Sequence, residues 1–204
     1  MLCLRGASRW FGRHRVFSGL DVDVPTGTRL LVTGGNGSGK TTLLRCLAGT
    51  LSLTSGAALV DGHPAGSPAA RRALGVCLNP EQGLYGRLSG RDNLLLAARL
   101  RLPDATARRM VARVEDEFEI GPFARVPVQR CSAGMRARVT IARSLLADPA
   151  ALVLDEPGRS LDERARNLLW AALDRRPKLA CVVVSHQSED RDRCERTLTF
   201  PVHR

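Results

Sequence analysis

Short apolar runs alternate along this chain with segments whose apolar residues recur at helical spacing. The runs at 30–33, 152–154 and Ala180–Val184 are aliphatic and β-branched, which is typical of buried strands. Leucines spaced three and four residues apart predict a helix that begins near Lys40. A second amphipathic helix is predicted after Ser132, a residue type that commonly caps a helix start. The pattern therefore predicts an α/β fold with a mainly parallel sheet.

The segment between the first strand and the first helix is rich in glycine. Gly34 and Gly39 stand five residues apart and precede Lys40 and Thr41, which gives G-x-x-x-x-G-K-[ST] between a strand and a helix. Glycines let successive N–H groups turn inward at the positive end of a helix, where an anion is stabilised. The pattern predicts a nucleoside triphosphate held by these residues: Gly34, Asn36, Gly37, Ser38, Gly39, Lys40, Thr41 and Thr42.

Lys40 is one of only two lysines in a chain whose basic charge comes almost entirely from arginine. A compact, mobile ammonium suits contact with the β- and γ-phosphates better than a planar guanidinium does. The hydroxyl of Thr41 is the expected Mg²⁺ ligand.

Polar residues follow two of the predicted strands. The run 152–154 ends in Asp155 and Glu156, and the run Ala180–Val184 is followed by Ser185 and His186. Ligands of open α/β sheets bind at the carboxyl ends of the strands. We expect Asp155 to hold Mg²⁺ through water, Glu156 to polarise the attacking water, and His186 to bond the γ-phosphate or that water.

Composition narrows the remaining choices. No apolar run approaches the roughly 18–20 residues that a membrane-spanning helix needs. The six cysteines form no Cys-x-x-Cys pair, which argues against a zinc site or a disulfide framework. The net charge of +11 could attract nucleic acid, but one Tyr and five Phe leave few rings to stack on bases, so no nucleic-acid partner is expected. An arginine-rich surface near a membrane accounts for the charge.

The chain contains, in this order, the phosphate loop, "CSAGM" before an arginine-bearing helix, "LVLDEP", "SLD" and "SHQ". The order and spacing of these motifs resemble those of the ATP-binding cassette ATPases over residues 1–190. Here "CSAGM" stands in place of a Leu-Ser-Gly-Gly-Gln signature. The resemblance implies one nucleotide-binding domain over 1–204, with a P-loop NTPase core, an N-terminal antiparallel β lobe and an inserted helical lobe. The expected core covers 1–78 and 146–204, and the helical lobe with the signature covers 79–145.

In that family two domains pack head to tail around two ATP molecules. The resemblance implies that Ser132 and Gly134 contact the γ-phosphate in the partner's site and that Asp162 lies at the dimer contact. Phe11 matches the aromatic residue that stacks on adenine, and Trp10 is the second candidate.

The family's glutamine loop falls near residue 80. Asn79, Glu81 and Gln82 are all candidates for the residue that reaches Mg²⁺ and the attacking water. The resemblance to drug and polysaccharide exporters favours Glu81.

The resemblance implies an ATP-hydrolysing subunit, with ATP and Mg²⁺ as cofactors, that powers a separate membrane permease. Such a subunit is cytoplasmic and peripheral at the inner face of the cell membrane. The short stretch after His186, "SAGM" and "GLYGRLSGRDNL" favour an exporter of the drug, polysaccharide or haem type. The alternatives are a soluble, non-transport cassette ATPase acting on the ribosome or DNA, and a regulatory module that binds ATP without turnover.

Overall fold

The computed structural model describes residues 1–200, which form two compact units. The first contains Met1–Leu78, Ala150–Glu156 and the described residues from Lys178 onward. The second contains Asn79–Pro149 and Pro157–Pro177. The predicted helical lobe also begins at residue 79, but the chain returns to the first unit at 150 and not at 146. Residues 157–177, which the prediction assigned to the core, belong to the second unit, and 201–204 lie outside the described residues.

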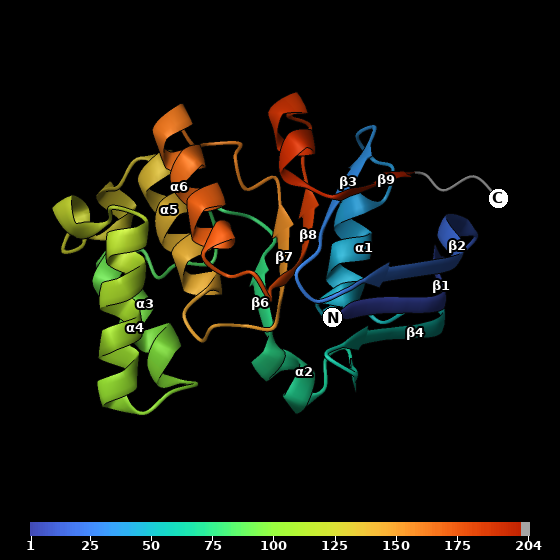
Figure 1. Ribbon diagram of the computed structural model, residues 1–204, viewed down its shortest axis with the longest axis horizontal. Coiled ribbons are helices and arrows are strands. Elements are labelled where there is room, and N and C mark those ends of the chain that lie inside the picture. The colour runs from blue at the N-terminus through green and yellow to red at the C-terminus, as the bar shows by residue number, and fades with distance from the viewer. Residues whose placement is uncertain (201–204) are drawn as a thin grey trace. The chain divides into compact units, whose positions relative to one another are not determined.

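The first unit begins with an antiparallel sheet. Its order is β2-β1-β4-β5, made by β1 (Leu2–Phe11), β2 (His14–Val24), β4 (Ser55–Val60) and β5 (His63–Pro64). Leu2 and Leu4 of β1 are fully buried while Arg5 and Gly6 are exposed, so one face of the strand packs on the core. This sheet is the predicted antiparallel β lobe (Figure 1).

The second sheet of the first unit is entirely parallel. Its order is β6-β7-β8-β3-β9, from β3 (Arg29–Gly34), β6 (Leu74–Cys77), β7 (Ala151–Asp155), β8 (Ala180–Val184) and β9 (Arg196–Phe200). Every residue of β7 and β8 is buried, as the continuous apolar runs predicted.

Helices complete the first unit. Helix α1 (Lys40–Leu47) packs across β3, β7 and β8, and its buried leucines Leu43, Leu44 and Leu47 join the core beneath the parallel sheet (Figure 1). The shorter α2 (Pro68–Ala73) and the 3-10 segment η3 (Ser188–Arg193) connect strands. Because β3, β7 and β8 are parallel neighbours, their carboxyl ends meet at one edge of the sheet, and the residues that follow them are brought together there.

The second unit is helical. It holds α3 (Gly90–Arg99), α4 (Asp104–Glu117), α5 (Ala133–Ser144), α6 (Glu163–Asp174) and the 3-10 turns η1 (Gly121–Phe123) and η2 (Val128–Arg130). Ser89, Ser132 and Asp162 cap α3, α5 and α6 by accepting a hydrogen bond from the backbone N–H three residues on. Within residues 1–200, none of the helices has both the length and the hydropathy needed to cross a bilayer.

Candidate active site

The glycine-rich loop lies between the end of β3 and the start of α1, as predicted. Gly34 and Gly39 have φ of 140° and 104°, in the region that side chains disfavour. A Cβ at Gly34 would lie 2.1 Å from the carbonyl oxygen of Phe200, and one at Gly39 would lie 2.3 Å from Cγ1 of Val16. No side chain caps the start of α1, so its first N–H groups remain available to an anion.

Lys40 is buried, with 7% of its surface exposed, and its ammonium curls back over the loop. Its Nζ donates hydrogen bonds to the carbonyl oxygens of Gly34 at 2.7 Å and Gly35 at 2.8 Å. The charge is therefore held at the mouth of the loop, and no carboxylate within residues 1–200 forms an ion pair with it. An ammonium bonded only to neutral carbonyls is suited to exchange them for phosphate oxygens.

Asp155 ends β7 directly beside α1. The Thr41 hydroxyl donates a hydrogen bond of 2.6 Å to its Oδ2, which joins two residues 114 positions apart. Burial raises the pKa of Asp155, and the Thr41 hydroxyl and the Lys40 charge oppose that rise. One hydroxyl and one carboxylate oxygen meet here, and both are ligand types that Mg²⁺ accepts.

Glu156 and His186 complete this edge of the sheet. The Glu156 N–H donates to the Val184 carbonyl at 2.9 Å, and Glu156 has a φ of 48°. Its Oε1 lies 3.3 Å from His186 Nε2, but the geometry is not that of a hydrogen bond and this oxygen is buried without a partner. Burial raises the pKa of Glu156, and His186 opposes that rise. A buried carboxylate oxygen that lacks a donor is suited to bind and polarise a water molecule.

These side chains surround a cavity of about 270 Å³. It is lined by residues 36–42, Asp155, Glu156, Val184 and His186. The Ser38 hydroxyl oxygen and Glu156 Oε1, both at this cavity, are buried and have no hydrogen-bond partner among residues 1–200. Orphaned polar atoms, N–H groups, an ammonium and a hydroxyl–carboxylate pair together fit a magnesium triphosphate. The residues predicted to contact phosphate and metal in the first unit therefore all line this cavity, apart from Gly34, which pairs with Phe200 of β9.

The predicted adenine contact lies at the tip of the β1–β2 hairpin. Phe11 is 48% exposed and Trp10 is 37% exposed, so neither ring belongs to the core. Neither lines the cavity, which leaves the choice between them a prediction. The guanidinium of Arg9, which lies 4.3 Å from the centre of the Phe11 ring, was not foreseen. Its position two residues before Phe11 on one strand is the sequence signal that could have revealed it.

The remaining predicted residues lie in the second unit. Ser132 is exposed at the start of α5, where its Oγ accepts a hydrogen bond of 3.2 Å from the Met135 N–H. Gly134 follows in the first turn, where a Cβ would lie 3.0 Å from the carbonyl oxygen of Ser160. Asp162 caps α6 through a 2.7 Å bond from the Ala165 N–H. Ser132 and Asp162 thus have local capping roles, and their contacts across a dimer stay a prediction.

The candidates for the glutamine loop have distinct environments. Glu81 accepts a hydrogen bond from the Ser160 hydroxyl, a partner 79 positions away that the sequence did not indicate. Asn79 Oδ1 accepts the Glu81 N–H at 3.0 Å, and Gln82 is exposed. Of the three candidates, Glu81 is the one whose side chain is bonded to a distant segment of the chain.

Comparison with known proteins identifies the family. The family described as "ABC transporter" matches residues 17–159. The daunorubicin resistance ATP-binding protein DrrA3 of Streptomyces coeruleorubidus is 38% identical over 81% of this chain and 53% of its own length. The Nod factor export ATP-binding protein I of Ralstonia nicotianae is 35% identical over 85% of this chain and 54% of its own length. The chain belongs to the ABC transporter family, as predicted, and spans about half the length of these curated relatives.

A solved structure supports the fold. The ATP-binding cassette MJ0796, in a dimeric post-hydrolysis state bound to ADP and Pi, superposes with a TM-score of 0.87. The match covers 98% of this chain and 94% of that chain at 21% identity. The predicted P-loop cassette fold is confirmed.

Proposed function

We propose that this chain binds and hydrolyses ATP and that the hydrolysis powers export through a separate membrane permease. The 2.6 Å bond between Thr41 and Asp155, beside the buried ammonium of Lys40, carries the proposal. Thr41 and Asp155, the proposed metal ligands, and Lys40, the proposed phosphate-binding cation, all line one cavity, which supports the proposal. The names of the relatives, which are drug-resistance and export ATP-binding proteins, support the transport role.

The chemistry follows from the side chains around the cavity. The N–H groups of the loop and Lys40 bind the phosphates, and Lys40 exchanges the Gly34 and Gly35 carbonyls for phosphate oxygens. Bound Mg²⁺ would neutralise charge on the phosphate oxygens, held by Thr41 and Asp155. Glu156 holds and polarises a water for in-line attack, and His186 lies 3.3 Å from that carboxylate, where it can orient the water or a phosphate oxygen.

The site is proposed to be completed by a second cassette, a second copy or a close relative. The N-terminus of α5, with Ser132 and Gly134, supplies a further anion-binding helix end for the nucleotide of the partner, and Asp162 lies at the same contact. The subunit is held at the inner face of the membrane by its permease.

Substitution of Glu156 tests the proposal. We expect Glu156→Gln to lower phosphate release from the complex co-purified with its permease by about 10²–10⁴-fold while it retains Mg-ATP binding, because the amide cannot polarise water as the carboxylate does. Glu189→Gln, an exposed residue of the same unit, is the control and should hydrolyse ATP normally. Normal turnover by Glu156→Gln would refute the role given to this residue. Binding without turnover by the unsubstituted complex would favour a regulatory module.

One observation favours a different class of function. The net charge of +11 suits a cassette ATPase that acts on the ribosome or DNA. Affinity purification from membranes separates the two proposals. Recovery of an integral membrane protein supports transport, whereas association that nuclease abolishes supports the alternative.

A further inference from the structure

The Phe11 ring has one covered face. The guanidinium carbon of Arg9 lies 4.3 Å from the ring centre, which is within cation–π range. Arg9 is itself anchored, since its Nη1 donates a 3.0 Å hydrogen bond to the Ser52 carbonyl and its Nε is buried. An aromatic ring on an exposed hairpin tip is thus stacked against a fixed cation, while 48% of the residue remains open to solvent.

The strand pairing of Arg9 relates the stack to residues near the phosphate loop. Arg9 and Phe11 are two residues apart on β1 and share one face of the strand. Phe17 is the cross-strand partner of Arg9, and its ring meets that of Phe200 edge-on at 6.0 Å. The Phe200 ring would lie 3.7 Å from a Cβ on Gly39, the residue just before α1. The pairing of Arg9 with Phe17 and the contact between Phe17 and Phe200 therefore relate the position of the stack to the segment just before α1.

Trp10 has a similar neighbour on the opposite face of the strand. It stands between Arg9 and Phe11, so its side chain projects to the other side. The guanidinium carbon of Arg15, its cross-strand partner, lies 5.9 Å from its ring centre. The hairpin thus carries two arginine–aromatic stacks, on opposite faces of β1.

We propose that Arg9 is a positioning residue for the base of the bound nucleotide. By stacking on one face of Phe11, it holds the ring in one orientation and leaves the opposite face for the purine. The proposal rests on the proposed ATP-binding function. Arg9 should therefore affect the binding of the base and not that of the phosphates. Its contacts are with Phe11 and Ser52, and it does not line the phosphate cavity.

Two ligands that share phosphates but differ in the base test the inference. Calorimetric titration with Mg-ATP and with magnesium tripolyphosphate would be compared for the parent and for Arg9→Met, which keeps much of the apolar stem. We expect the Kd for Mg-ATP to rise about threefold to tenfold in Arg9→Met and that for tripolyphosphate to stay unchanged. Arg9→Lys, which keeps the charge, should recover much of the loss. Arg15→Met is the matched control and should change neither Kd.

Each other result overturns the inference in a recognisable way. If Arg9→Met weakened the binding of both ligands equally, Arg9 would stabilise the fold and would not position the base. Weakening of Mg-ATP by Arg15→Met instead would transfer the base to Trp10. If the parent bound Mg-ATP no more tightly than tripolyphosphate, the base would not stack on Phe11, although the phosphate site would still bind its ligand. A parent that binds neither ligand would refute the proposed ATP-binding function itself.

Discussion

Asp155 is a carboxyl group in an environment that disfavours its charge. It is 7% exposed, and burial raises its pKa although Thr41 donates to it and Lys40 lies near. A carboxyl group with a raised pKa in the folded state stabilises the protein below its unfolded pKa, and that stability is lost as the pH rises through the folded pKa. At neutral pH the nucleotide-free protein therefore bears a cost at Asp155 that a bound cation would offset.

Removal of that charge should stabilise the free protein. We expect Asp155→Asn to raise the midpoint of thermal unfolding by about 2–4 °C at pH 7.5, and the difference should vanish near pH 4 as the parent carboxyl becomes protonated. Added Mg-ATP should reverse the order, because the parent's carboxylate charge attracts the metal and the neutral amide lacks that charge. A variant that is less stable than the parent at both pH values would contradict this account. Thermal unfolding with and without Mg-ATP measures all of these effects.

Glu156 marks a limit of what sequence can predict about a single residue. Its position after a buried strand and an aspartate predicted its chemistry. Its φ of 48°, which costs about 1–2 kcal/mol for a residue with a Cβ, could not be read from the sequence. The conformation accompanies the bond from its N–H to the Val184 carbonyl on the neighbouring strand, so it depends on tertiary structure.

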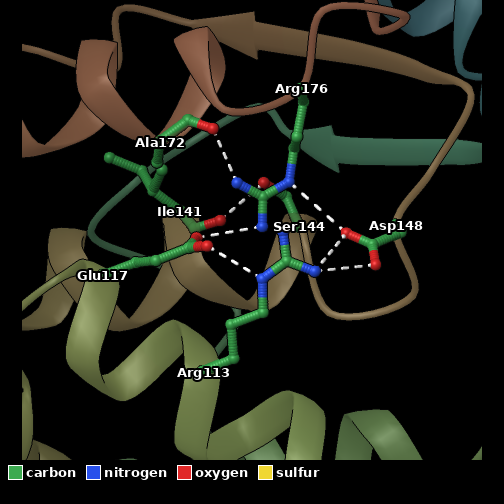
Figure 2. A network of polar contacts seen from close by, with 7 residues as sticks. All are labelled: Arg113, Glu117, Ile141, Ser144, Asp148, Ala172 and Arg176. Atoms are coloured by element: carbon green, nitrogen blue, oxygen red, sulfur yellow. Dashed lines mark hydrogen bonds and ion pairs between the residues drawn. The ribbon is translucent and has the colours of Figure 1, made fainter.

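A ring of four charges joins helices of the second unit (Figure 2). Glu117, at the end of α4, accepts hydrogen bonds of 2.9 Å from both Arg113 and Arg176. Asp148, in the loop after α5, forms ion pairs with the same two arginines at 2.9 and 3.5 Å. Arg176 also donates to the Ala172 carbonyl at the end of α6. The ring therefore ties α4, α6 and the loop after α5 together.

The two arginines should contribute unequally. The side chains of Arg176 and Glu117 are 7% and 8% exposed, whereas that of Arg113 is 40% exposed. We expect Arg176→Met to lower the free energy of unfolding by about 3 kcal/mol, because it removes the buried one of the two arginines that pair with the buried Glu117 carboxylate. Arg113→Met should cost about 1 kcal/mol or less. Urea denaturation measures both changes.

Two further variants make the test of this ring specific. Arg175→Met, the exposed neighbour, should change the free energy of unfolding by less than about 0.5 kcal/mol. Pairing Arg176→Met with Glu117→Leu should recover part of the loss, since the buried carboxylate is then removed together with its buried partner. Equal costs for Arg176→Met and Arg175→Met would show that the ring does not stabilise this unit.

Local patterns in the sequence could predict one ion pair of this ring but not the pair between distant residues. Arg113 and Glu117 are four residues apart on a helix, a spacing that predicts a pair. Arg176 and Glu117 are separated by 59 positions, and no periodicity connects them. Arg136 and Arg138 donate instead to backbone carbonyls of the second unit, so part of the net charge of +11 serves its structure.

At the scale of the whole chain, the sequence predicted where some strands lie but not their order in the sheet. Apolar runs located β3, β7 and β8, because strands buried on both faces need continuous apolar sequence. They could not give the spatial order β6-β7-β8-β3-β9, which differs from the order along the chain. The compact units and the predicted domain parts divide the chain differently at residues 157–177. Helix α6 is amphipathic, and periodicity does not say what its apolar face covers.

The proposed second cassette gives the exposed start of α5 a function. Ser132 already satisfies one N–H of α5 as its cap, yet it stays exposed at a helix end without acidic residues in the first turn. Such a helix end attracts an anion. If the anion is the γ-phosphate bound by a partner subunit, ATP should link two chains, and a negative charge at Ser132 should prevent the link.

Asp and Asn at Ser132 separate this charge effect from helix capping, because both are good N-caps and only Asp is charged. In the Glu156→Gln background with Mg-ATP, we expect the chain and its Ser132→Asn variant to sediment as dimers. Ser132→Asp should weaken dimerisation on the order of 100-fold, because two like charges would face each other at the contact. All three should unfold at similar temperatures and bind Mg-ATP equally as monomers. If Ser132→Asp dimerised as Ser132→Asn does, the start of α5 would not face a phosphate, and a chain that stayed monomeric with Ser132 intact would not pair with itself.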